Sequence, residues 1–197
     1  MPKLRLDASA RRSFLLIMIV LFSYSLGGNA VETYFTLYAT HDLHMQAAAA
    51  GGALTFYAGG AILFAIVAGV IGEHLGRRPT MSIGLICGVL AFIPMPWIGR
   101  AGLIIPLALL FGIAWTLVFV NALPWIAELG GTERNGTMTA YYYLATSGGA
   151  AISPTLYGLV QQWTGEYRWM FLYAAVFFIA ALACMPFIKH GEAPRQQ

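Results

Sequence analysis

The 197-residue sequence has few charged residues and only two cysteines. Both features limit the classes of protein to which it can belong. Charged side chains make up 10% of the chain, whereas a soluble domain carries about 25%, so an ordinary water-facing surface is excluded. Cys87 and Cys184 lie in separate apolar stretches and are interpreted as small buried side chains. The net charge of +3 comes without a basic face or a nucleic-acid-binding motif, so no nucleic-acid partner is expected.

Long apolar runs dominate the sequence instead. Hydrophobic residues make up 59% of the chain, and a membrane-spanning helix needs roughly 20 mostly apolar residues. Six segments meet this requirement: 14–38, 46–71, 80–99, 103–126, 137–162 and 168–188. The sequence therefore predicts an all-α membrane protein, a six-transmembrane-helix bundle over 13–188, with short segments at 1–12 and 189–197 and the lipid bilayer as its main surroundings.

The basic residues predict the orientation of this bundle. Six spans put both termini on one side, and only Arg100 and Arg168 fall on the other side. The nine bases on the side of the termini are Lys3, Arg5, Arg11, Arg12, Arg77, Arg78, Arg134, Lys189 and Arg195. Because cytoplasmic loops carry an excess of bases, we expect cytoplasmic termini and a bacterial inner (plasma) membrane. A cleaved signal peptide is less favoured, because the first apolar run continues to Tyr38.

The first apolar segment carries a row of polar residues. Ser25, Asn29, Glu32 and Thr36 recur at spacings of four, three and four, which places them on one helical face. Glu32 is the only acidic residue within a predicted span, and acids inside membranes usually couple ions or protons. We therefore expect Glu32 to be a proton-coupling residue. The alternative is a wet, inert position near the outer interface.

Polar side chains also mark the fourth and fifth segments, while the third and sixth hold few of them and are expected to face lipid. Amides bind hydroxyl groups and indole rings stack on sugar faces. The residues expected along a substrate path are therefore Asn29, Ser25, Trp115, Asn121, Trp125, Tyr143 and Thr146.

A short charged turn, GVIGEHLGRR at 69–78, separates the second and third segments. Its pattern is carried by Gly69, Glu73, Gly76, Arg77 and Arg78. This spacing resembles the loop signature of the major facilitator superfamily of transporters, with His74 where a base is usual and Glu73 in place of aspartate. The resemblance implies a gating loop that latches neighbouring helices in the outward-open state.

The resemblance covers about residues 12–190 and implies one six-helix half, most like a C-terminal half, of a fold with two such halves. In this family the substrate site forms between the halves at mid-membrane. The chain is therefore expected to be a half-size secondary active transporter that moves a small polar solute by alternating access with proton coupling, as symport or antiport and without a cofactor. Its partner would be a second copy in a homodimer or a complementary six-helix half, and both remain open.

The sequence also bears on two other classes of function. The motifs HExxH, GxGD and GxSG are absent, which argues against an intramembrane protease or another enzyme. His41, Asp42 and His44 share one loop and are interpreted as solvated side chains, so no metal is expected. A non-transporting membrane scaffold or regulatory subunit is the remaining alternative, although it has no need of polar faces inside its spans.

Overall fold

The described part of the computed structural model, residues 7–98, 101–130 and 135–190, is helical and contains no strand. Its α-helices are α1 (Ala8–His41), α2 (Ala47–Leu75), α3 (Arg77–Phe92), α4 (Met95–Ile98), α5 (Ile104–Gly130), α6 (Asn135–Thr164) and α7 (Met170–Cys184). Three short 3-10 helices accompany them: η1 (Ala101–Leu103), η3 (Tyr167–Trp169) and η4 (Met185–Phe187). The prediction of an all-α membrane bundle is confirmed.

Five helical segments are long and apolar enough to cross a membrane: Ala8–His41, Ala47–Leu75, Arg77–Ile98, Ile104–Gly130 and Tyr167–Phe187. The sixth long helix, α6, has 30 residues and is therefore long enough to span a bilayer. It is not among the five by composition, and it carries the polar stripe that faces the cleft described below.

The helices differ most from the predicted segments at α1 and α3. Helix α1 begins at Ala8, ahead of the expected membrane domain at 13–188. The third predicted segment, 80–99, is not one continuous helix, because α3 ends at Phe92 and α4 begins at Met95. Pro94 lies in this break, and proline lacks the N–H that a continuous helix would need there.

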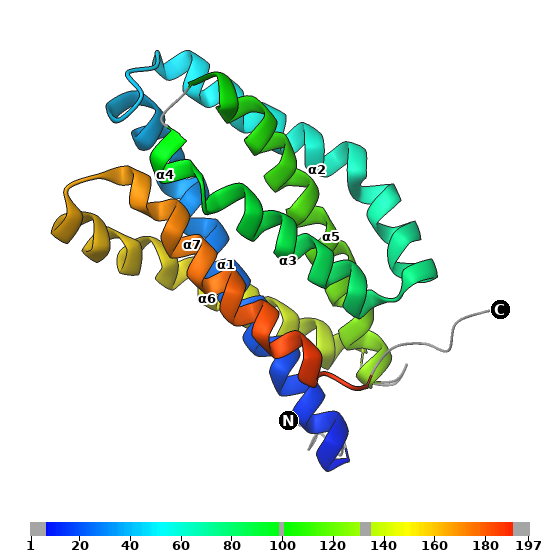
Figure 1. Ribbon diagram of the computed structural model, residues 1–197. Coiled ribbons are helices and arrows are strands. Elements are labelled where there is room, and N and C mark those ends of the chain that lie inside the picture. The colour runs from blue at the N-terminus through cyan, green and yellow to red at the C-terminus, as the bar shows by residue number, and fades with distance from the viewer. Residues whose placement is uncertain (1–6, 99–100, 131–134, 191–197) are drawn as a thin grey trace.

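The helices form two groups of three (Figure 1). Helix α1 packs mainly against α6 and α7, whereas α5 packs mainly against α2 and α3. The groups meet through α3 and α7 and, less extensively, through α5 and α6. The chain therefore passes from the first group to the second after α1 and returns to the first group at α6.

Glycines let helices of this bundle approach closely. A Cβ atom added to Gly112 of α5 would lie 2.2 Å from the backbone oxygen of Tyr57 on α2. One added to Gly84 of α3 would lie 2.9 Å from the backbone oxygen of Ala114 on α5. Because real Cβ contacts are never as short as the first of these, α5 can occupy its place against α2 only with glycine at position 112.

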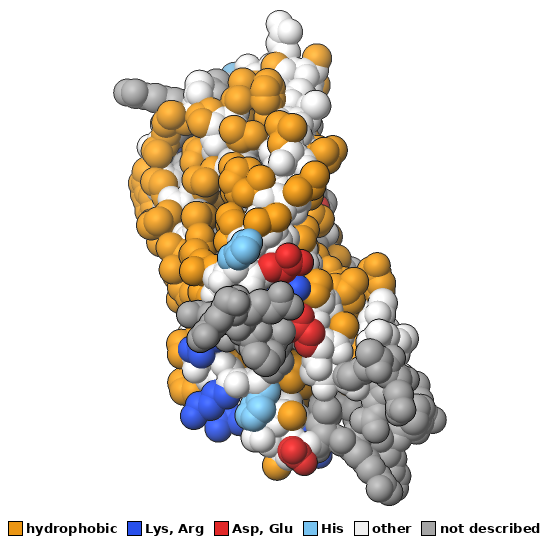
Figure 2. Space-filling model, turned by 90° about the vertical axis from the view of Figure 1, so that its right-hand side faces the viewer, with side chains coloured by type: hydrophobic (Ala, Val, Ile, Leu, Met, Phe, Trp, Pro, Cys, Tyr) orange, Lys and Arg blue, Asp and Glu red, His pale blue; other side chains and the backbone are white. Residues whose placement is uncertain are grey.

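Apolar side chains cover much of the outer surface. Exposed apolar residues occur on α3 and α7, for example Leu90 and Val176, as expected for helices that face lipid. The most exposed helix is α2, where Leu63 is 78% and Ile66 is 80% accessible, and the sequence did not single out this helix. Figure 2 shows hydrophobic side chains over the upper part of one face and charged side chains gathered toward the end where α1 begins.

Candidate functional site

An open cleft of about 590 Å³ lies between α1, α2, α5 and α6. It is lined by Ser25, Asn29, Glu32, Tyr57, Trp115, Phe119, Val120, Tyr142, Tyr143, Thr146, Ser147 and Ala150. Its wall contains hydroxyl, amide and carboxylate groups together with several aromatic rings. Such a wall offers hydrogen-bonding groups and flat apolar surfaces to the same small polar molecule.

Six predicted residues line this cleft together: Ser25, Asn29 and Glu32 of α1, Trp115 of α5, and Tyr143 and Thr146 of α6. Glu32 is the expected proton-coupling residue, and the other five were expected along the substrate path. Helix α1 supplies the first three because spacings of three and four residues return to the same helical face. The same periodicity brings Tyr143 and Thr146 of α6, which packs against α1, to the cleft. Trp115 stacks on Phe119, also of α5, with ring centroids 4.7 Å apart.

Asn121 and Trp125, which were expected on the same path, lie elsewhere. Both are fully buried, and neither lines the cleft. The amide of Asn121 donates to the backbone oxygen of Ala68 at 3.1 Å, and the indole N–H of Trp125 donates to the backbone oxygen of His190 at 3.1 Å. The physical reason is helical periodicity, since Asn121 is rotated by about 240° from Trp115 around α5.

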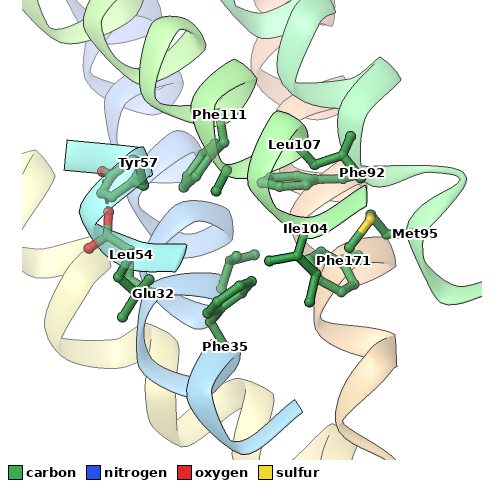
Figure 3. A pocket seen from close by; sticks show the side chains of 12 residues that line it. Glu32, Phe35, Leu54, Tyr57, Phe92, Met95, Ile104, Leu107, Phe111 and Phe171 are labelled. Carbon is green, nitrogen blue, oxygen red and sulfur yellow. Dashed lines mark hydrogen bonds between the residues drawn. The ribbon is translucent and has the colours of Figure 1, made fainter. Parts of the chain in front are cut away.

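The carboxylate of Glu32 has a partner that the sequence did not indicate. The hydroxyl of Tyr57 on α2 donates a hydrogen bond of 2.6 Å to Glu32 Oε1 (Figure 3). Tyr57 is also stacked on Phe111 of α5, with ring centroids 5.0 Å apart. No polar stripe on α2 could have identified Tyr57, because its helix neighbours one turn away are apolar or glycine.

A second, smaller cavity of about 30 Å³ lies behind this pair. Its walls are almost entirely apolar and include Phe35, Phe92 and Phe111 (Figure 3). Glu32 and Tyr57 line both the cleft and the cavity. The hydrogen-bonded pair therefore forms part of the wall between a wide polar space and a space of about the size that one or two water molecules need.

The depth of Glu32 follows from its place in α1. About 14 Å of helical rise separates it from His41, the last residue of α1. Aromatic residues of five helices line the cavity beside it. Glu32 thus lies within the bundle, well below the end of the helix.

The charged turn between α2 and α3 connects three parts of the bundle. Arg77 donates to Asn121 Oδ1 at 3.2 Å and lies 3.6 Å from a carboxylate oxygen of Glu128 on α5. Arg78 donates to the backbone oxygen of Pro186, after α7, at 3.2 Å. Glu128 was not among the expected residues of the turn, because it is distant in sequence.

Gly69 and Gly76, at the two ends of the glycine pattern in this turn, differ in whether the structure requires glycine. Gly76 has φ 102° and ψ 151°, a conformation that is essentially restricted to glycine. Gly69 would meet only ordinary contact if it carried a Cβ, at 3.8 Å from Val120. Gly72, which lies between them, has no such room, because its Cβ would overlap the side chain of Asn121.

A cluster of charged residues, Asp42, Glu166 and Arg168, lies at the opposite end of the bundle from the charged turn. The backbone N–H of Arg168 donates to Asp42 Oδ2 at 3.0 Å, and its guanidinium donates to Glu166 with an Nε to Oε2 distance of 2.7 Å. Burial raises the pKa of Asp42 above its usual value, whereas the hydrogen bond from Arg168 lowers the pKa of Glu166. In the described ranges, no three His, Cys, Asp or Glu side chains are grouped so as to hold a metal ion.

Comparison with solved structures shows the same fold in several transporters. The human organic anion transporter MFSD10 (TETRAN) has 17% identity and a TM-score of 0.73, with 93% of this chain and 48% of that chain covered. The proton:xylose symporter XylE bound to 6-bromo-6-deoxy-D-glucose has 16% identity and a TM-score of 0.70, covering 93% and 46%. A POT family transporter in complex with a thioalcohol-conjugated peptide has 17% identity and a TM-score of 0.78, covering 91% and 38%.

The chain spans less than half the length of each of these solved transporters. No curated protein matches the sequence. The family described as Major Facilitator Superfamily matches residues 17–197, which is most of the chain, and its members are in general transporters and not enzymes. This multi-pass integral membrane chain belongs to the major facilitator superfamily.

Proposed function

We propose that this chain is one six-helix half of a secondary active transporter that moves a small polar solute by alternating access. The observation that carries the proposal is the cleft of about 590 Å³, which opens along α1 and α5 and is flanked by α2 and α6. Its hydroxyl, amide and aromatic groups suit a solute with several hydrogen-bonding groups. Ser25, Asn29, Trp115, Tyr143 and Thr146 are the proposed contacts.

Proton coupling is proposed to depend on Glu32. Its carboxylate faces the cleft and receives a hydrogen bond from Tyr57, so it can interact with a solute and exchange a proton with water in the cleft. A carboxyl group that changes protonation between two states of the transporter would link proton movement to solute movement. The direction of coupling, symport or antiport, follows from the transport measurement below.

A partner is needed to enclose the path. The cleft is open on one side, and α2, beside it, exposes large apolar side chains such as Leu63 and Ile66. In this family the substrate site forms between two halves. A second copy of the chain would supply a second Glu32 and Asn29 across the path, whereas a complementary half would supply different residues.

Transport by vesicles that contain only this chain tests the proposal. Proteoliposomes with a pH-sensitive dye inside would be offered sugars, short peptides and organic anions, the solute classes of the similar solved transporters. We expect uptake driven by a proton gradient, and its loss in Glu32→Gln. Glu166→Gln, which changes an acid in the turn before α7, is the matched control and should retain uptake.

Two results would contradict parts of this proposal. Gradient-driven uptake that persists in Glu32→Gln would remove Glu32 from the coupling step. The absence of uptake of every solute, by a chain that forms stable dimers, would favour the scaffold or regulatory subunit instead.

Cross-linking distinguishes a homodimer from a complex with a separate half. In a background of Cys87→Ala and Cys184→Ala, one tagged copy would carry Ile66→Cys on α2 and a second would carry Leu144→Cys on α6. These positions lie nine residues from the helix ends that share one side of the bundle, so they are at a similar depth. A homodimer predicts a disulfide between the two copies, and the control Leu90→Cys on α3, in place of Ile66→Cys, should give none.

The proposed location is a bacterial inner membrane with both termini in the cytoplasm. The support is the excess of bases on the side of the termini. Labelling of Ser9→Cys in the same cysteine-free background tests it, since only a membrane-permeant maleimide should react in intact cells.

A further inference from the structure

We propose that a pocket at the terminal end of the bundle binds the phosphate of an anionic phospholipid head group. The pocket has a volume of about 280 Å³ and lies between the beginning of α1 and the residues that follow η4. It is lined by Ser9, Arg12, Ser13, Phe187, Lys189 and His190. This site is separate from the cleft and does not depend on the proposed transport function.

The residues of the pocket are held in place by hydrogen bonds across the bundle. The hydroxyl of Ser13, which is buried, lies 3.2 Å from His190 Nδ1 and accepts the backbone N–H of Lys189 at 3.3 Å. The indole N–H of Trp125 donates a hydrogen bond of 3.1 Å to the backbone oxygen of His190. Two helices, α1 and α5, therefore fix the backbone of the segment after η4, which presents Lys189 and His190.

The chemistry of the lining suits a phosphate. Arg12 and Lys189 provide two positive charges, and Ser9 provides an exposed hydroxyl beside them. In the part of the chain that the structure describes, neither base forms an ion pair with an acidic side chain, and no acidic residue lines the pocket. In the sequence, the acids nearest to these bases are Asp7, five residues before Arg12, and Glu192, three residues after Lys189 and outside the described residues.

The position of the pocket indicates a lipid rather than a soluble phosphate. It lies where the apolar surfaces of α1 and α7 end, the depth at which head groups are found. Phe187, one of its walls, is 55% exposed and offers an apolar surface to the glycerol and first acyl carbons. Arginine and lysine near an anionic membrane surface each contribute about 1 kcal/mol to binding, or roughly fivefold in affinity.

The test is lipid retention by the full chain. The protein in detergent would be incubated with dioleoylphosphatidylglycerol or with dioleoylphosphatidylcholine, and bound lipid would be counted by native mass spectrometry. We expect phosphatidylglycerol to bind in preference, and Arg12→Gln and Lys189→Gln each to weaken it about fivefold. Arg11→Gln removes an equal charge from the neighbouring exposed position, which does not line the pocket, and should bind as the unchanged protein does.

A second variant tests the geometry without changing the charge. Ser13→Ala removes the hydroxyl that holds the backbone of Lys189, so we expect weaker retention of phosphatidylglycerol with an unchanged number of bases. The proposal is overturned if Arg11→Gln weakens binding as much as Arg12→Gln, if phosphatidylcholine binds equally well, or if millimolar inorganic phosphate displaces the lipid.

Discussion

The hydroxyl of Tyr57 on α2 and the carboxylate of Glu32 on α1 are joined by a 2.6 Å hydrogen bond. This contact links two helices that otherwise pack little against each other, since the main partners of α1 are α6 and α7. It also separates the cleft from the small apolar cavity behind it. A change in the protonation of Glu32 would therefore act directly on the contact between α1 and α2.

Replacing Tyr57 with phenylalanine should lower the free energy of unfolding by about 1.5 to 3 kcal/mol, the usual contribution of a hydrogen bond to a charged group. Uptake driven by a proton gradient should decrease but remain, because the carboxylate is still present. Unfolding in detergent, followed by circular dichroism against denaturant concentration, measures the first effect. The matched control is Tyr34→Phe, which removes a hydroxyl that donates to the backbone oxygen of Pro154 and should leave proton coupling unchanged.

Gly72→Ala should destabilise the protein by about 1 to 3 kcal/mol, the range for overpacked interiors. Its new methyl group would displace the Asn121 side chain. The amide of Asn121 donates a hydrogen bond to the backbone oxygen of Ala68 and accepts one from Arg77. Gly69→Ala, one turn earlier, has room for the methyl group and should change the unfolding free energy little. Equal effects of the two substitutions would contradict the described packing of α2 against α5.

Gly76→Ala should also cost about 1 to 3 kcal/mol, for a different reason. The backbone at Gly76 has φ 102°, which places any Cβ in steric conflict with its own backbone. Gly136→Ala in the first turn of α6 is a suitable control, because nothing lies within 4 Å of the added methyl group and alanine favours helices. Melting temperatures in detergent should fall for the first variant and stay equal or rise for the second.

Asp42→Asn should not destabilise the protein at neutral pH. Because burial raises the pKa of Asp42 in the folded state, its contribution to stability is greatest below the usual aspartate pKa and is lost as pH rises through the folded value. Asparagine keeps an oxygen that can accept the N–H of Arg168 without the charge. Melting temperatures of both proteins between pH 3 and 8 measure this, and a variant less stable than the unchanged protein at pH 7 would contradict it.

The sequence predicted the parts of this protein that depend on local pattern. Run length located the six long helices, and the spacing of Ser25, Asn29 and Glu32 identified the face of α1 that lines the cleft. Residue type alone did not show that Asn121 and Trp125 are buried on another face of α5, away from the cleft. Continuing the helical period from Trp115 would have separated them.

Other features depend on how helices meet, which no single segment records. Gly112 lets α5 approach the backbone of α2 at Tyr57, and the side chain of Tyr57 reaches across to Glu32 on α1. Glu128 reaches Arg77 because α5 returns to the end of the bundle where α2 and α3 join. Both contacts connect residues far apart in the chain, so periodicity within either helix could not reveal them.

The order of the helices along the chain has a consequence for how the bundle assembles during synthesis. Of these helices, α1 is made before the others, but its main partners, α6 and α7, come after α2, α3 and α5. The group of α1, α6 and α7 therefore cannot be completed from one continuous stretch of chain, whereas α2, α3 and α5 all lie within 47–130. Helix α1 therefore enters the bilayer with its polar face unshielded by α6, and its group packs only after α6 and α7 have been inserted.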